Sequence, residues 1–239
     1  MEKSRIKYLV FDTFGTVVDW RGTIQREGLR LTETYGLRVD WNDLAIRWRK
    51  EGYFKVTFDI AAGKRPWISA DEIFTEFLLD NKDGLGLTPV PDQALKEFSL
   101  VWHRLAPWED AIEGLTRLKN KYAIGPFSNG DFKLMLDIAK SGGLPWDFIT
   151  SGDLFRKFKP DPTIYQDEVA LLGVEPCEVA MVSAHPFDLD GAKKIGCMTL
   201  YVPRPEEYGR DSGYVEPEGE TAYDEKLSNF LALADFMGV

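Results

Sequence analysis

A short, uninterrupted apolar run near the start of the chain most constrains the fold. It spans Tyr8 to Phe11, is rich in β-forming residues, and leads directly to Asp12. Such a run is typical of a parallel strand covered on both faces, and Gly15 supplies a turn soon after it. Because ligands bind beyond the carboxyl ends of the strands in open parallel sheets, Asp12 is a candidate nucleophile. The alternative is that this aspartate only caps a turn, since Asp is a common turn residue.

Strand and helix patterns alternate from His103 onward and predict a parallel α/β sheet. Strands are expected over residues 122–127, 148–150, 179–182 and 198–202, and helices over residues 111–121, 132–140, 162–172, 189–195 and 227–237. This alternation is the signature of repeated βαβ units. Pro126 is awkward in a central strand because proline has no N–H group. The stretch from Arg204 to Glu220 is rich in proline, glycine and charge, so we expect it to run over the surface.

The stretch before His103 has helical periodicity instead. One helix is expected to begin near Asp40, and Ser69 to Glu72 forms a capping box ahead of another. We therefore predict a doubly wound parallel-sheet core of Rossmann type, made of residues 1–17 and 103–239, with an inserted helical cap domain of residues 18–102. His103 lies at the predicted hinge, where we expect it to serve packing.

Composition argues against several classes of function. The chain has 239 residues, of which 44% are hydrophobic, so it can bury a full core. Its net charge of -10 disfavours nucleic acid and anionic membranes as partners. Cys177 and Cys197 form no CxxC pair or Cys/His cluster, so neither a zinc site nor a disulfide scaffold is supported. Without a signal-peptide core or a membrane-length apolar segment, we expect a cytoplasmic protein.

Polar residues stand at four places that the predicted sheet brings to one edge. They are Asp12, Ser128 with Asn129, Lys159 before a helix, and Ser183 with His185 and Asp188. In a doubly wound sheet these side chains point into one crevice. That crevice would hold a carboxylate nucleophile, a lysine that keeps it ionised, neutral donors for an anion, and groups that handle water.

These motifs resemble those of the haloacid dehalogenase superfamily, and more narrowly of its L-2-haloacid dehalogenase branch. The matching segments are Phe11-Asp12-Thr13-Phe14-Gly15-Thr16, Ser128-Asn129-Gly130, Lys159-Pro160 followed by Tyr165, and Val182-Ser183-Ala184-His185-Pro186-Phe187-Asp188. The likeness follows the family's order and spacing over nearly the whole chain, firmly in the sheet domain and loosely in the helical insert. Each motif alone is weak evidence, whereas four in order are strong.

Two positions distinguish this branch from the Mg²⁺-dependent phosphatases of the superfamily. Phosphatases use a second aspartate to protonate the leaving group, and Phe14 stands in its place. A halide needs no such acid. Ala184 replaces an acidic metal ligand, and Asp12 and Asp188 beside Lys159 make a poor magnesium site. The resemblance therefore implies an enzyme without a metal or other cofactor. A magnesium-dependent phosphatase acting on a small phosphomonoester is the alternative.

The resemblance also implies a role for each matched residue. Asp12 attacks C2 of a short 2-haloalkanoic acid, halide leaves, and water then hydrolyses the aspartyl ester to a 2-hydroxy acid. Lys159 keeps Asp12 ionised. Ser183, His185 and Asp188 surround the water, and the substrate-binding residues are Thr13, Phe14, Thr16, Arg49, Ser128, Asn129 and Tyr165. The implied partners are the 2-haloacid and the halide, and a homodimer remains open.

Three of these residues have alternatives. His185 stands where the family has Asn, and we hypothesise that His185 with Asp188 is the base for ester hydrolysis. Its alternative is a hydrogen bond to a loop. Arg49 matches the halide-binding arginine of the family's cap but lies in a basic run, so a solvated helix face is equally open. Ser128 either holds the substrate carboxylate or serves only the turn. A serine hydrolase is disfavoured because Pro126 stands at the first glycine of the required elbow.

Overall fold

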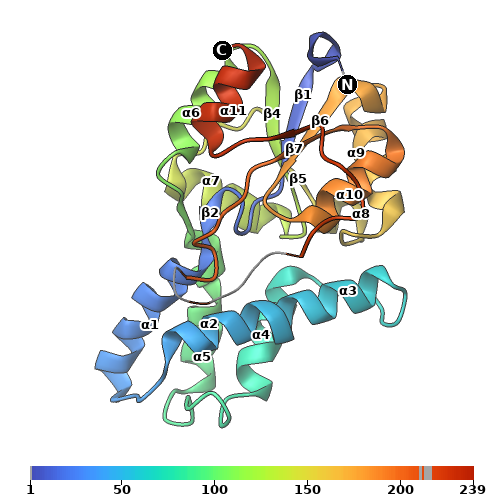
Figure 1. Ribbon diagram of the computed structural model, residues 1–239. Helices are drawn as coiled ribbons and strands as arrows, with labels where there is room; N and C mark the ends of the chain where they lie inside the picture. The colour runs from blue at the N-terminus through green and yellow to red at the C-terminus, as the bar shows by residue number, and fades with distance from the viewer. Residues whose placement is uncertain (1, 210–211, 213–216) are drawn as a thin grey trace.

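The computed structural model describes residues 2–209, 212 and 217–239. Within them, six parallel strands form the main sheet in the order β5-β4-β1-β6-β7-β8 (Figure 1). Their bounds are β1 Tyr8–Phe11, β4 Ala123–Ser128, β5 Thr150–Ser151, β6 Val179–Ser183, β7 Met198–Tyr201 and β8 Glu225–Lys226. The predicted α/β fold with a parallel sheet is confirmed, and β8 is an edge strand that the sequence pattern did not indicate.

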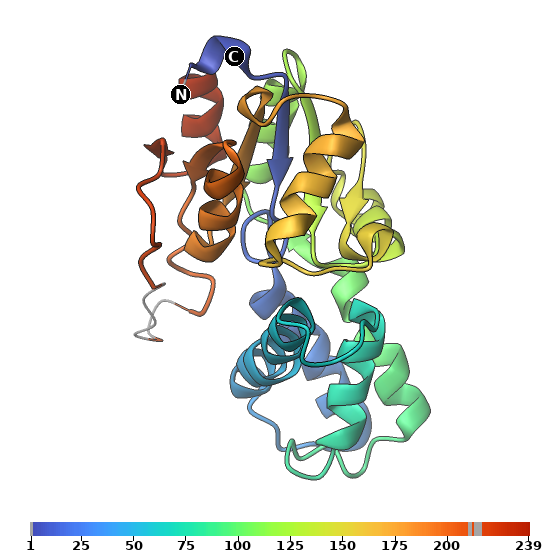
Figure 2. The same cartoon turned by 90° about the vertical axis from the view of Figure 1, so that its right-hand side faces the viewer.

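Helices cover both faces of the sheet (Figures 1 and 2). One face carries α6 (Ala111–Lys119), α7 (Phe132–Gly142) and α11 (Phe230–Met237), and the other carries α9 (Pro162–Leu172) and α10 (Pro186–Ile195), with the short α8 (Gly152–Phe155) nearby. Alternate residues of β1 serve the two faces. Leu9 and Phe11 belong to the core under α6 and α11, whereas Val10 packs beneath α9 and α10. This double burial explains why the strand has no polar alternation.

A separate helical layer lies beyond the carboxyl ends of the strands (Figure 2). It contains α1 (Trp20–Tyr35), α2 (Trp41–Arg47), a π-helical segment (Trp48–Phe54), α3 (Lys55–Ala61), α4 (Ala70–Asp80), α5 (Asp92–Ser99) and a 3₁₀ turn (Leu100–Arg104). Asp40 caps α2, and the predicted capping box at Ser69 is present. We propose residues 18–102 as this cap unit. Its two connections run side by side, because β2 (Val18–Asp19) pairs antiparallel with β3 (Ala106–Pro107).

Polar contacts hold the helical layer against the core. The Asp131 carboxylate, at the start of α7, accepts the N–H groups of Ala70 and Asp71 at the start of α4, at 3.0 and 2.9 Å. The His103 ring lies between Asp71 and Asp137 of α7, at 2.9 and 2.7 Å. Burial works against a charge on His103, but its two carboxylate partners raise the pKa of the ring above its usual value. His103 therefore joins the cap to the core by an ionic contact as well as by packing.

Three local expectations need correction or explanation. Helix α10 begins at Pro186 and not at residue 189, since proline favours the first helical position. Helix α11 begins at Phe230, because residues 225–226 pair with β7. Pro126 does lie within β4, where its carbonyl accepts the Thr150 hydroxyl at 2.7 Å on the side of the short strand β5. The pairing with β1 therefore does not need its missing N–H. No helix in the described part of the chain is long and apolar enough to cross a membrane.

Candidate active site

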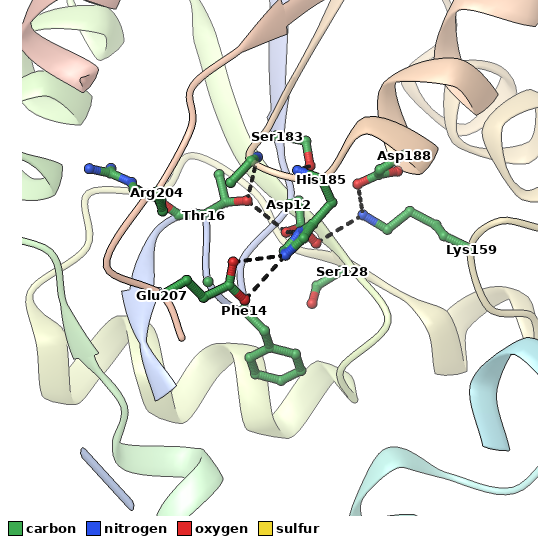
Figure 3. Close-up of polar contacts among 12 residues, drawn as sticks. Asp12, Phe14, Thr16, Ser128, Lys159, Ser183, His185, Asp188, Arg204 and Glu207 are labelled. Carbon is green, nitrogen blue, oxygen red and sulfur yellow. Dashed lines mark hydrogen bonds and ion pairs between the residues drawn. The ribbon is translucent and has the colours of Figure 1, made fainter. Parts of the chain in front are cut away.

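Asp12 lies directly after β1, at the edge of the sheet that faces the helical layer, and only 8% of it is exposed. Its Oδ1 is 3.2 Å from Lys159 Nζ. Its Oδ2 accepts the Thr16 hydroxyl at 2.7 Å and is 2.9 Å from His185 Nδ1 (Figure 3). Burial favours the neutral acid, but Lys159 and His185 outweigh burial and hold the pKa of Asp12 well below its usual range. Asp12 is therefore a carboxylate.

Lys159 is buried and uses its ammonium group for three acceptors. Besides Asp12, these are Asp188 Oδ2 at 2.5 Å and the carbonyl of Phe127 at 2.8 Å. Burial alone would lower its pKa, but the two carboxylates raise that pKa, so the side chain stays charged. The Asn129 amide accepts the Lys159 N–H at 2.6 Å and donates to the Lys159 carbonyl at 2.9 Å. Asn129 thus fixes the backbone from which the lysine reaches the site.

Asp188, at the start of α10, is held from two sides. Its Oδ1 accepts the Tyr165 hydroxyl at 2.9 Å, and its Oδ2 accepts Lys159. Burial raises the pKa of Asp188. The Tyr165 ring packs directly against Gly191, where a Cβ would lie 2.3 Å from the ring and clash with it. Asp188 thus contacts Lys159 and Tyr165, and no hydrogen bond joins it to His185 among the described residues.

His185 instead lies between two carboxylates. Its Nε2 is 3.2 Å from both carboxylate oxygens of Glu207, on the opposite side of the ring from Asp12. Burial disfavours the charged ring, but Glu207 and Asp12 more than offset this and raise its pKa well above the usual value. The ring is therefore an imidazolium. In the free enzyme it has no lone pair with which to take a proton, and the hypothesis that His185 acts as the base in the ester state stays a prediction.

Glu207 is a residue that the sequence reasoning missed. We expected residues 204–220 to run over the surface, yet Glu207 is buried, and Arg204 Nε donates to the carbonyl of Thr16 at 2.9 Å. This part of the expectation is wrong because ion pairing, not apolar periodicity, draws the segment inward. The available signal was His185 itself, since a charged histidine buried beside one ionised aspartate needs a second anion as the acceptor for its other N–H group.

Arg49, in the π-helical segment of the cap, is 2% exposed and faces the site. Its Nη2 donates to the carbonyl of Phe14 at 3.1 Å, and its guanidinium lies 4.1 Å from the centre of the Phe54 ring. Neither Nε nor Nη1 has a hydrogen-bond partner within the described residues. The alternative of a solvated helix face is therefore wrong. Buried N–H groups without partners are suited to bind an anion.

The remaining residues from the motifs line the same region. The Ser128 hydroxyl accepts the N–H of Gly130 at 3.1 Å, and the Ser183 hydroxyl accepts the N–H of His185 at 3.0 Å. Each hydroxyl keeps its own proton for donation. The buried Thr13 hydroxyl has no partner among the described residues. The Phe14 ring packs against Tyr53, Phe74 and Trp102 of the cap, with centroid distances of 5.6, 6.1 and 5.3 Å.

The charges of the site balance. Three buried carboxylates, Asp12, Asp188 and Glu207, are matched by three buried cations, Lys159, His185 and Arg49. Within the described residues, no group of three or more His, Cys, Asp or Glu side chains is arranged to hold a metal ion. The Lys159 ammonium lies between Asp12 and Asp188 and contacts both carboxylates. The arrangement therefore presents an ionised carboxylate, N–H groups for an anion, and a second carboxylate beside them.

Comparison with known proteins gives four findings. A family model described as haloacid dehalogenase-like hydrolase matches residues 6–196. The (S)-2-haloacid dehalogenase of Xanthobacter autotrophicus is 30% identical over 202 residues, which cover 83% of this chain and 76% of that protein. The crystal structure of a defluorinating L-2-haloacid dehalogenase matches with a TM-score of 0.90 and 35% identity, over 98% of this chain and 96% of that one. The Xanthobacter autotrophicus enzyme with chloropropionic acid covalently bound matches with a TM-score of 0.80 and 25% identity, over 97% and 98% of the two chains.

Proposed function

This chain belongs to the haloacid dehalogenase-like hydrolase family and is an enzyme of the (S)-2-haloacid dehalogenase type, and we propose that it hydrolyses short 2-haloalkanoic acids to 2-hydroxy acids. The proposed route is a covalent ester on Asp12, formed without a metal ion. A covalent route is supported by the related structure that carries bound chloropropionic acid. The proposed partners are the 2-haloacid and the halide, and the proposed location is the cytoplasm.

The observation that carries the proposal is the state of Asp12. It is a buried, ionised carboxylate held by Lys159 from one side, and no acidic side chain stands at position 14, where Phe14 packs into the cap. A carboxylate with few water molecules around it is a better nucleophile than a solvated one. A site without a general acid suits a leaving group that departs as a stable anion, as halide does.

In this proposal Arg49 and the neutral donors bind different parts of the substrate. Two buried nitrogens of Arg49, Nε and Nη1, have no hydrogen-bond partner among the described residues, which supports its assignment to the departing halide. The hydroxyls of Ser128 and Thr13, with the N–H groups of Thr13 and Phe14, are assigned to the substrate carboxylate. The Oδ1 oxygen of Asp12 is the one assigned to attack C2, since Oδ2 already accepts two donors.

In the second half of the reaction, water attacks the ester. Asp188 is the proposed base, because burial raises its pKa and so increases its affinity for a proton. The Tyr165 hydroxyl and Lys159 fix its orientation, and Ser183 is the proposed contact of the water. Water bonds to Cγ of Asp12, the bond between Cγ and Oδ1 breaks, and the 2-hydroxy acid leaves with the proton that Asp188 took.

Metal independence is supported by the position of Lys159. Its ammonium group fills the space between the two carboxylates that a magnesium ion would have to bridge. The positive charge of Lys159 then takes the place of a metal ion, because it keeps the Asp12 carboxylate ionised.

The test is a single-turnover reaction with 2-chloropropionate in ¹⁸O-water and excess EDTA. We expect stoichiometric chloride release and ¹⁸O in the side chain of Asp12, measured by peptide mass spectrometry. Asp12→Asn is expected to release no chloride, whereas the surface control Asp43→Asn behaves as the wild type. Chloride release without label at Asp12 contradicts the covalent route. Activity only after magnesium is added, with phosphate released from phosphomonoesters, favours the phosphatase alternative.

A further inference from the structure

Asp12, His185 and Glu207 form a continuous chain of hydrogen bonds, and the proposed reaction assigns no role to His185 or Glu207. Nδ1 of His185 is 2.9 Å from Asp12 Oδ2, and Nε2 is 3.2 Å from both oxygens of Glu207. A neutral imidazole has only one N–H group, so one of its nitrogens would turn a lone pair toward a carboxylate. Asp12 and Glu207 both have lowered pKa values, because each lies beside a cation, so both are ionised. Between two ionised carboxylates, each ring nitrogen finds an acceptor only when both nitrogens carry protons.

The segments around Glu207 are shaped to hold its carboxylate in this place. Trp20 Nε1 donates to Glu207 Oε1 at 2.8 Å, and Arg21 Nε donates to the Glu207 carbonyl at 3.2 Å. Gly15 has a φ of +89°, and a Cβ at this position would lie 2.2 Å from Glu207 Oε1. The turn that follows the nucleophile thus leaves room for this carboxylate, which reaches it from a distant loop.

We propose that Glu207 is a positioning residue that keeps His185 as a charged donor to Asp12 Oδ2, and that His185 and Thr16 together form the oxyanion hole for ester hydrolysis. This inference rests on the proposed function, because it concerns the second step of that reaction. It assigns His185 the role of electrostatic stabiliser in place of the role of base.

The chemistry of the ester explains the need for such a donor. When water adds to Cγ of the Asp12 ester, the electron pair of the carbonyl bond moves onto Oδ2, which becomes an oxyanion. Oδ2 is the oxygen that already accepts the Thr16 hydroxyl at 2.7 Å and faces His185 Nδ1 at 2.9 Å. These donors lie in place before the charge develops, so little reorganisation is required. When the bond from Cγ to Oδ1 breaks, the electron pair on Oδ2 returns to the carbonyl bond.

Other groups near His185 do not replace Glu207. The rings of Phe54 and Phe187 pack beside the imidazole, with centroid distances of 6.2 and 5.8 Å, and keep it dry. The carboxylates that face it are Asp12 and Glu207. The next charges outward are cations: Lys159 beside Asp12, and Arg49 and Arg204 near Glu207. Alkylation of Asp12 removes one of the two anions, so in the ester state Glu207 is the remaining countercharge. Its effect on hydrolysis is therefore larger than its effect on alkylation.

The first test follows the imidazole by ¹⁵N NMR in the free enzyme. The chain has two histidines, His103 and His185. The signals that disappear in His185→Asn therefore belong to His185. We expect both ring nitrogens of His185 in the wild type to remain protonated at pH 8, and those in Glu207→Gln to lose a proton below that pH. The exposed neighbour Glu206→Gln is the matched control and should leave the titration unchanged. A neutral His185 ring in the wild type at pH 8 overturns the proposal, even if the variant does not fold.

The second test follows the two chemical steps as a function of pH. For Glu207→Gln at pH 8.5 we expect the burst of chloride to persist while ester hydrolysis slows by about 100-fold, the loss typical of one oxyanion-hole donor. The rate of hydrolysis should recover as pH falls, which a merely structural defect would not produce. Glu207→Asp should retain most of the wild-type profile. Equal slowing of both steps at every pH overturns the proposal.

The two tests separate this inference from the function on which it rests. In one outcome, the wild type forms no ester at Asp12, and His185 remains charged only when Glu207 is present. The proposed reaction and the oxyanion hole are then wrong, but the effect of Glu207 on the charge of His185 stands. If the ester forms and Glu207→Gln hydrolyses it like the wild type, the function stands and the role of Glu207 is wrong.

Discussion

Replacing Glu168 by Gln tests how a buried carboxyl group outside the active site affects stability. Glu168 lies on α9 and is 1% exposed. Its Oε1 accepts the Thr150 hydroxyl at 2.9 Å, whereas its Oε2 has no partner among the described residues. Burial raises the pKa of this carboxyl to about 7, with the hydrogen bond from Thr150 and the charge of Lys159 opposing it only in part.

The direction and size of the effect follow from proton linkage. The ordinary pKa of 4.5 applies to the unfolded chain, and about 7 applies to the folded protein. Between these values the folded state keeps a proton on Glu168 that the unfolded state has lost, so the contribution of Glu168 to stability is greatest below pH 4.5 and is lost as pH rises to 7. The full loss is about 3 kcal/mol, since each factor of ten in proton affinity corresponds to about 1.4 kcal/mol. Glutamine does not ionise and avoids this loss.

Urea denaturation of both proteins at pH 5 and pH 8.5 measures the effect. We expect the free energy of unfolding of Glu168→Gln, relative to the wild type, to increase by about 2–3 kcal/mol between the two pH values. The difference between pH values cancels any constant cost of burying the amide. Glu113→Gln on the exposed face of α6 is the control and should change by less than about 0.5 kcal/mol. A relative stability that is the same at both pH values would refute the reasoning.

Three further changes test the site. Lys159→Met leaves the buried Asp188 without a cation and Asp12 with His185 as its remaining cationic partner. Urea denaturation at pH 7 should therefore show a loss of about 3–5 kcal/mol, and an unchanged midpoint would argue against the ion pairs of Lys159. Arg49→Lys removes the two guanidinium nitrogens, Nε and Nη1, that have no partner among the described residues. We expect inhibition by chloride to weaken about tenfold, measured from initial rates, and undiminished inhibition would place the halide elsewhere. Gly15→Ala combines an unfavourable positive φ with a Cβ that displaces Glu207, so it should lower the melting temperature through a loss of at least about 1 kcal/mol, and a variant as stable as the wild type contradicts the close contact.

Local patterns were sufficient for most of the architecture. The run from Tyr8 to Phe11 predicted a doubly covered strand because burial on both faces removes polar alternation, and the structure places it at the centre of the sheet. Helix ends marked by Ser69 and Pro162 were predicted since capping depends on neighbours within one turn. Strand β8 was not predicted, because a two-residue edge strand is defined by its partner and not by its own sequence.

The sequence by itself determined the chemistry that follows from residue type and strand order. Asp12, Lys159 and Asp188 were expected in one crevice because parallel strands bring their carboxyl ends to one edge, and the structure places all three in contact through the lysine. Only the tertiary structure decided that Arg49 faces inward, since a basic run has the same pattern whether it meets water or a buried site. It also decided that both nitrogens of the His185 ring face carboxylates, which raise its pKa in the free enzyme. The protonation state of a side chain is set by charges a few ångströms away in space. The decisive charge here, Glu207, comes from a loop whose sequence has no periodicity that would predict burial.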